Sequence, residues 1–174
     1  MKRILILGCP GAGKSTLARR LAARTGLPLI HLDQMYWQPG WKEPVKKEWL
    51  RRLDDALAGR SWIIEGNYSS TLERRLKAAD TAILVDVPRM ICIARVLRRT
   101  VSGFGRTRPD MAVGCPERLN IDFLSYTWTF RSKQLPATLV QLEAFDGEFM
   151  VLRSVRDVKG CLGRFSSAED AAGA

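Results

Sequence analysis

Histidine is nearly absent from this chain, and its cysteines are widely separated, which argues against a zinc site. The only histidine is His31. The four cysteines, Cys9, Cys92, Cys115 and Cys161, form no C-x-x-C pair. A structural zinc site needs about four clustered Cys or His ligands. Scattered cysteines in a basic chain are typical of reduced thiols in the cytosol.

Long hydrophobic runs are absent as well. No apolar run approaches the ~20 residues that span a bilayer. The apolar segment after Met1-Lys2-Arg3 is shorter than the ~7–15 residues of a signal-peptide core, and it runs directly into a glycine-rich loop. We therefore expect a cytoplasmic protein without a membrane partner.

Acidic residues are outnumbered by basic ones. The 174 residues include 28 Lys and Arg but 18 Asp and Glu, for a formal net charge of +10. This excess favours anionic partners such as phosphorylated small molecules or nucleic acid. No helix-turn-helix, zinc or single-strand-binding motif accompanies the charge, so nucleic acid is a partner without a supporting motif.

One motif carries specific chemistry. Residues 8–15 read Gly-Cys-Pro-Gly-Ala-Gly-Lys-Ser, the G-x-x-x-x-G-K-S phosphate loop, between a predicted strand and a predicted helix. Loop amides and the helix N-terminus bind phosphates, Lys14 is expected to reach the β- and γ-phosphates, and the Ser15 hydroxyl to hold Mg²⁺. The residues predicted to bind the nucleoside triphosphate are Gly8, Pro10, Gly11, Ala12, Gly13, Lys14, Ser15 and Thr16.

Short apolar runs alternate with amphipathic stretches along the chain. The predicted strands are 2–7, 28–32, 61–64, 81–87 and 148–152. The predicted helices are 14–24, 45–58, 70–78, 88–100, 117–145 (kinked or split at Pro136) and 155–162. This alternation predicts one α/β domain over residues 1–165 with a parallel sheet and right-handed crossovers. The small, polar tail 166–174 is expected to be disordered.

Acidic residues end three of the predicted strands. Asp33, Glu65 and Asp86 each follow an apolar run. P-loop enzymes use a second acidic group to position Mg²⁺. By sequence pattern Asp86 fits this role best. The choice among the three carboxylates depends on the order of the strands in the sheet, which composition does not reveal. Because ligands bind at the carboxyl ends of parallel strands, all three carboxylates are expected near Gly8 and Arg153.

The chain resembles the small adenylate-kinase-like P-loop proteins, and more closely their subgroup of DNA topology modulation proteins. The segments that carry the resemblance are GCPGAGKST, LPLIHLDQMYW, WIIEGNYSSTL, AILVDVP, RPDMAVGCPERL and VLRS, within about residues 2–160. It implies a three-layer P-loop NTPase fold with a five-stranded parallel sheet flanked by helices and an arginine-rich lid at about 101–116. It also implies transfer of the γ-phosphoryl group of Mg·ATP to a small acceptor, such as a nucleotide or nucleoside.

The resemblance also implies roles for single residues. In these kinases the third strand lies beside the P-loop strand, so Glu65, in place of the usual aspartate, takes the magnesium role and Asp86 becomes structural. Asp33 lies near the acceptor hydroxyl, which it orients or deprotonates. Arg153 lies at the nucleotide base. The arginines expected to contact the phosphates are Arg98, Arg106, Arg108 and Arg131.

Several alternatives stay open at this point. The residues Tyr36, Trp37, Trp41, Asn67 and Tyr68 fit an acceptor site and fit packing under a loop equally well. His31 is expected to be an ordinary strand residue. Two functions compete with the kinase: a nucleic-acid-associated regulatory ATPase, and a nucleotide-binding protein without catalysis, which the replacement of aspartate by Glu65 would explain.

Overall fold

The sheet is built from five parallel strands. A computed structural model describes residues 1–165, so the expectation of a disordered tail at 166–174 lies outside the described residues. The strands are β1 (Arg3–Gly8), β2 (Leu29–His31), β3 (Trp62–Glu65), β4 (Thr81–Val85) and β5 (Glu148–Leu152). Their order across the sheet is β2-β3-β1-β4-β5. The predicted α/β fold with a five-stranded parallel sheet is confirmed.

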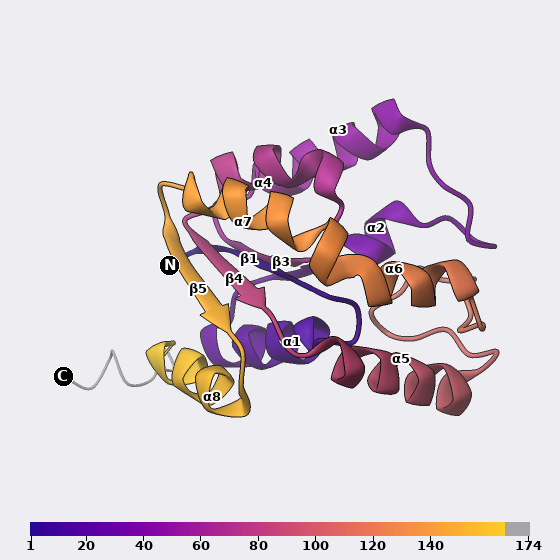
Figure 1. Cartoon of the computed structure of the whole chain (residues 1–174). Helices are drawn as coiled ribbons and strands as arrows, with labels where there is room; N and C mark the ends of the chain where they lie inside the picture. The colour runs from indigo at the N-terminus through magenta and orange to yellow at the C-terminus, as the bar shows by residue number, and fades with distance from the viewer. Residues whose placement is uncertain (166–174) are drawn as a thin grey trace.

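Helices cover both faces of the sheet (Figure 1). On one side lie α1 (Lys14–Thr25), α5 (Arg89–Gly103) and α8 (Val155–Arg164). On the other side lie α3 (Lys46–Leu57), α4 (Leu72–Ala78), α6 (Ile121–Lys133) and α7 (Leu135–Glu143), and α6 also packs on α5. None of the helices in the described part of the chain combines the length and apolar character needed to cross a membrane.

The middle of the sheet is buried on both faces, and its buried residues are apolar except for Glu65 at the end of β3 and Thr81 at the start of β4. All residues of β3 and β4 are buried, and so are all residues of β1 after Arg3. A helix layer on each face explains why these strands do not alternate apolar and polar residues. In the register of β1 with its neighbours, Ile6 pairs with Glu65 and Gly8 with Val85, so the ends of three strands meet where the phosphate loop begins.

Most predicted boundaries differ from the observed ones by one to three residues, and three regions differ in a way that matters for the site. The chain turns into a short helix, α2 (Leu32–Tyr36), where an extended end and an irregular stretch were expected. Helix α5 continues to Gly103, so the first residues of the predicted lid are helical. The predicted helix 117–145 is two helices that begin only at Ile121, and Pro136 lies in the first turn of α7, where its missing N–H costs no helical bond.

Positive charge is concentrated in the helices on one side of the sheet. Helices α1 and α5 each carry four Lys or Arg and no acidic residue, and α8 carries three with Asp157 as its one acid. On the other side, α3 alone has four basic and three acidic residues. The net charge of the chain is therefore distributed unevenly between the two helical layers.

The junction of β1 with the phosphate loop leaves no room for a side chain at Gly8. The residue has a φ of +138°, and a Cβ there would lie 2.3 Å from the Val85 carbonyl oxygen. We predict that Gly8→Ala lowers the free energy of unfolding by about 3 kcal/mol or more, measured by urea denaturation. Gly26→Ala is the control, because Gly26 also has a positive φ but an added Cβ meets no atom. Its cost is expected to be about 1 kcal/mol from backbone strain alone. Equal losses for the two variants would contradict the packing argument.

Candidate functional site

A large cavity with a volume of about 1250 Å³ opens at the carboxyl end of the sheet. Its lining comes from the phosphate loop and the start of α1, from the residues that follow β2 and β3, and from the segment between α5 and α6. The lining includes Lys14, Ser15, Asp33, Glu65, Tyr68 and Arg108. Asp33 and Glu65, which come from the ends of different predicted strands, therefore face one space.

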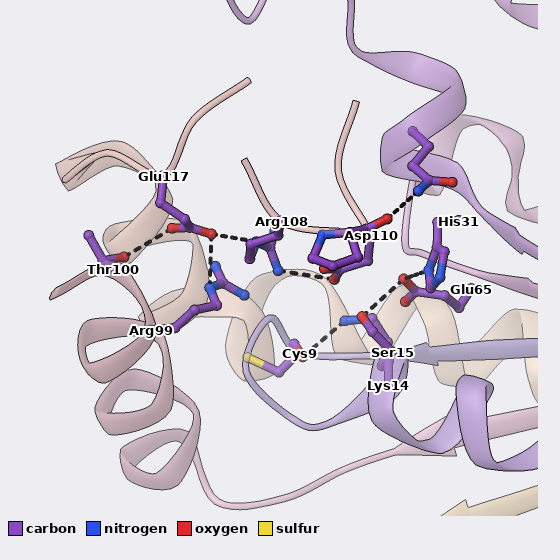
Figure 2. Close-up of polar contacts among 12 residues, drawn as sticks. Cys9, Lys14, Ser15, His31, Glu65, Arg99, Thr100, Arg108, Asp110 and Glu117 are labelled. Atoms are coloured by element: carbon purple, nitrogen blue, oxygen red, sulfur yellow. Dashed lines mark hydrogen bonds and ion pairs between the residues drawn. The ribbon is translucent and has the colours of Figure 1, made fainter. Parts of the chain in front are cut away.

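The phosphate loop has the backbone path that anion binding requires. Gly8, Gly11 and Gly13 all have positive φ. Gly13 is the N-cap of α1 and has no side chain to satisfy the first amides of that helix. Those amides and the positive end of the helix dipole are thus available to an anion. The Lys14 ammonium donates to the Cys9 carbonyl at 3.1 Å and lies over the loop (Figure 2).

Glu65 is the carboxylate that contacts the phosphate loop. Its Oε1 accepts a hydrogen bond from Ser15 Oγ at 3.1 Å and lies 2.8 Å from His31 Nδ1 (Figure 2). Burial opposes ionisation of Glu65, but the hydrogen bond from His31 and the charge of Lys14 outweigh it, so its pKa lies below the usual value. Glu65 is therefore ionised at neutral pH. His31 is more than an ordinary strand residue, because it orients this carboxylate.

Ser15 and Glu65 together fit a magnesium ion. Both present oxygen atoms, which Mg²⁺ prefers, and Mg²⁺ in nucleotide sites takes one or two protein ligands, with phosphate oxygens and water completing the shell. Within residues 1–165 no group of three or more His, Cys, Asp or Glu side chains could hold a metal ion by itself. The residues present thus fit an ion that arrives with the nucleotide.

Asp33 lines the same cavity. It is the second residue of α2, and its Oδ1 accepts a hydrogen bond from the Tyr68 hydroxyl at 2.7 Å. Burial raises the pKa of Asp33, and the bond from Tyr68 partly offsets that increase. A carboxylate with a raised pKa is better matched to accepting a proton from a hydroxyl. Tyr68 itself has a φ of +37°, an unusual backbone conformation for a residue with a side chain.

Asp86 is held in ion pairs outside the cavity. Its Oδ2 lies 3.2 Å from Arg131 Nη2 and 3.8 Å from Arg153 Nε. None of these three residues lines the cavity. The predicted contacts of Arg131 with the phosphates and of Arg153 with the base stay predictions, since both side chains are paired with Asp86 here. Arg106 is also outside the cavity, with an exposed side chain in a turn beyond α5.

Other arginines of α5 and the following segment do face the cavity. Arg98 and Arg108 line it, and so do Arg95 and Arg99. Arg95 Nη1 donates to the Ala12 carbonyl of the phosphate loop at 3.2 Å. These side chains bring positive charge to the space next to the phosphate loop, where the phosphates of a nucleotide would lie.

A buried acid organises the arginines beyond α5. Glu117 pairs with Arg99 Nε at 3.1 Å and with Arg108 Nε, and it accepts a hydrogen bond from Thr100 (Figure 2). Arg108 also pairs with Asp110 at 3.0 Å. No role was predicted for Glu117 or Asp110, although both lie in the segment RPDMAVGCPERL. Their sequence signal was the presence of two acidic residues among the arginines in and next to the predicted lid.

The aromatic residues serve packing and lining at once. Trp37 and Trp41 line the cavity and also pack on the small cluster of Met111, Ala112 and Cys115. Tyr36 packs edge-on against Trp37 and does not line the cavity. Packing is therefore shown for Tyr36, Trp37 and Trp41, while an acceptor site at the residues that line the cavity stays a prediction.

Comparison with known proteins places this site in a family. The profile of the family AAA_18, described as an AAA domain, matches residues 4–103. The chain belongs to this P-loop NTPase family. The matched part of the AAA domain runs from β1 to the end of α5 and includes the phosphate loop, Asp33 and Glu65.

Individual proteins that are similar to this chain are named as kinases. The shikimate kinase of Rhodococcus jostii (strain RHA1) is 30% identical over 132 residues, which are 67% of this chain and 74% of that protein. A sugar kinase from Janibacter sp. HTCC2649 has a TM-score of 0.50 at 20% identity, over 94% of this chain and 91% of that one. A candidate kinase from Chloroflexus aurantiacus J-10-fl has a TM-score of 0.57 at 18% identity, over 92% and 94%. The two structures establish a shared P-loop kinase fold.

The structure separates the two carboxylates that compete for the magnesium role. We predict that Glu65→Gln weakens binding of Mg·ATP about ten- to a hundredfold while leaving binding of metal-free ATP nearly unchanged. Asp86→Asn is the matched control. Asp86 directly follows β4, the other strand that pairs with β1, and its carboxylate contacts Arg131 instead of Ser15 or Lys14. Calorimetric titration with ATP in Mg²⁺ and in EDTA measures both affinities. If Asp86→Asn reduced the gain in ATP affinity from Mg²⁺ more than Glu65→Gln does, the magnesium role would belong to Asp86.

Proposed function

We propose that this protein is a kinase that transfers the γ-phosphoryl group of Mg·ATP to a hydroxyl group of a small molecule. The observation that carries the proposal is the arrangement of the cavity. The phosphate loop, the Ser15–Glu65 pair and the Asp33–Tyr68 pair all line it. A phosphoryl donor and a hydroxyl acceptor would thus meet in one enclosed space.

The named relatives support the acceptor chemistry. Shikimate and sugars both offer hydroxyl groups, and the proteins that carry these names are similar to this chain over most of its length. The likeness to adenylate-kinase-like proteins, including the DNA topology modulation subgroup, adds nucleotides and nucleosides to the acceptors to be tested. Each of these acceptors has a hydroxyl or phosphate oxygen as the attacking atom.

Each group in the cavity has a distinct task in this reaction. The loop amides and Lys14 bind the β- and γ-phosphates, and Arg98, Arg99 and Arg108 offset charge on the transferred group. Ser15 and Glu65 would hold Mg²⁺, which would supply positive charge to the phosphates. Asp33 orients the acceptor hydroxyl and accepts its proton.

The first prediction of this proposal concerns turnover. We expect acceptor-dependent release of ADP from Mg·ATP with at least one member of a panel of hydroxy acids, sugars, nucleosides and nucleoside monophosphates. Lys14→Ala is expected to abolish it, because the ammonium group bridges the phosphates. Coupled detection of ADP measures the rate. Release that responds only to DNA or RNA would favour a regulatory ATPase, and bound ATP without any release would indicate a protein without catalysis.

A second prediction concerns pH. Because burial raises the pKa of Asp33, and Asp33 must be ionised to accept a proton, activity is lost as the pH falls through that raised pKa. The bond from Tyr68 lowers this pKa, so Tyr68→Phe should move the acid limb of kcat/KM to higher pH by about one pH unit. Tyr36→Phe is the control, because Tyr36 packs on Tyr68 without a bond to Asp33. An unmoved acid limb in Tyr68→Phe would remove Asp33 as the proton acceptor.

A further inference from the structure

Arg75 is a buried cation without a carboxylate partner. It lies on α4, its side chain is fully inaccessible to solvent, and it forms no ion pair with any acid of residues 1–165. The neighbouring Arg74, by contrast, is exposed and forms an ion pair with Asp54 of α3 at 2.6 Å. Burial lowers the pKa of Arg75 to about 9, so the guanidinium group remains charged at neutral pH.

The partners of Arg75 are three consecutive backbone carbonyl groups. Nη1 donates to the Gly66 carbonyl at 3.0 Å, and Nη2 donates to the carbonyls of Asn67 and of Tyr68, the latter at 3.0 Å. Buried charges without a counter-ion are costly, and apolar replacements of buried charged groups are often tolerated or stabilising. Core packing alone therefore gives little reason for an arginine at this position.

The segment that Arg75 holds has a backbone that needs support. Gly66 has a φ of +138°, and a Cβ there would lie 2.9 Å from the Leu32 side chain. Tyr68, two residues later, has a φ of +37°. Unusual conformations of this kind persist only where surrounding contacts impose them. Three carbonyls turned toward one guanidinium group supply such contacts.

The same segment bears two side chains that face the two halves of the cavity. Asn67 Oδ1 accepts a hydrogen bond from the Gly8 amide at 3.1 Å, at the start of the phosphate loop. The Tyr68 hydroxyl donates to Asp33 at 2.7 Å. Glu65, which contacts Ser15, immediately precedes the segment. The residues between β3 and α4 are thus hydrogen-bonded both to the phosphate loop, through Asn67, and to Asp33, through Tyr68.

We propose that Arg75 is a positioning residue for both halves of the site. Its guanidinium group fixes the carbonyls of Gly66, Asn67 and Tyr68. It thereby places Asn67 against the phosphate loop and Tyr68 against Asp33. The part of the proposal that concerns the acceptor rests on the kinase function proposed above, whereas the part that concerns the phosphate loop requires only nucleotide binding.

The test uses Arg75→Lys. Lysine keeps the positive charge but lacks the planar guanidinium group that donates to the three carbonyls. Arg74→Lys, on the same helix, is the matched control. We expect Arg75→Lys to weaken binding of Mg·ATP about tenfold and to speed hydrogen exchange of the Gly8 amide, both without change in Arg74→Lys. Calorimetry and amide exchange followed by NMR measure the two effects. Neither needs an acceptor, so a failure of the kinase proposal leaves this test intact.

A double-mutant cycle distinguishes positioning from a general loss of stability. If Arg75 acts through Asn67, the effect of Arg75→Lys on Mg·ATP affinity should disappear in an Asn67→Ala background. Likewise, its effect on KM for an identified acceptor should disappear in Tyr68→Phe. Wild-type affinity and wild-type Gly8 exchange in Arg75→Lys would overturn the proposal, as would an effect that persists undiminished in the Asn67→Ala background.

Chemical rescue covers the case in which the lysine variant is poorly folded. Arg75→Ala leaves a cavity of the shape of the missing group, and guanidinium ion at low concentration should restore Mg·ATP binding to this variant. Methylammonium, with the same charge but no planar fork of donors, should not. Equal rescue by both cations, or by neither, would contradict a role that depends on the three carbonyl bonds.

Discussion

The site depends on one buried carboxylate and on the pairing of strands that places it. Glu65 ends β3, and the β1–β3 register sets it opposite Ile6, two residues before the phosphate loop begins. From there it reaches both Ser15 on α1 and His31 on β2. An ionised, nearly inaccessible group is stable only with such partners. The side chain that fits the metal role thus also connects β3 with β2 and with the start of α1.

Positive charge in the cavity is balanced in a similar way. Arg99 and Arg108 line the cavity, and Glu117, which lines it as well, is their shared partner. Arginines this close together would repel one another without such an acid. In the proposed reaction, this pairing would keep the two guanidinium groups in place to offset phosphate charge. Arg131 and Arg153 are balanced by Asp86, and none of these three residues lines the cavity.

The sequence predicted what depends on local pattern. Five strands, the phosphate loop and the flanking helices follow from apolar periodicity and one motif, and the strand β5 was predicted with its exact bounds. The choice between Glu65 and Asp86 did not follow, because both end strands next to β1. What separates them is a pair of long-range ion contacts, from α6 and from the end of β5, that occupy Asp86. Contacts between residues this far apart leave no periodic trace in a single sequence.

The uneven charge of the two helical layers has a consequence for how a nucleotide finds the site. Helices α1 and α5 border the phosphate loop and carry no acidic residue, so the field outside the cavity mouth attracts a triphosphate before any contact is made. Such a field increases the rate of diffusional encounter and is screened by salt. The association rate constant for ATP should therefore fall with ionic strength, while the dissociation rate constant, which reports the contacts inside the cavity, stays comparatively constant.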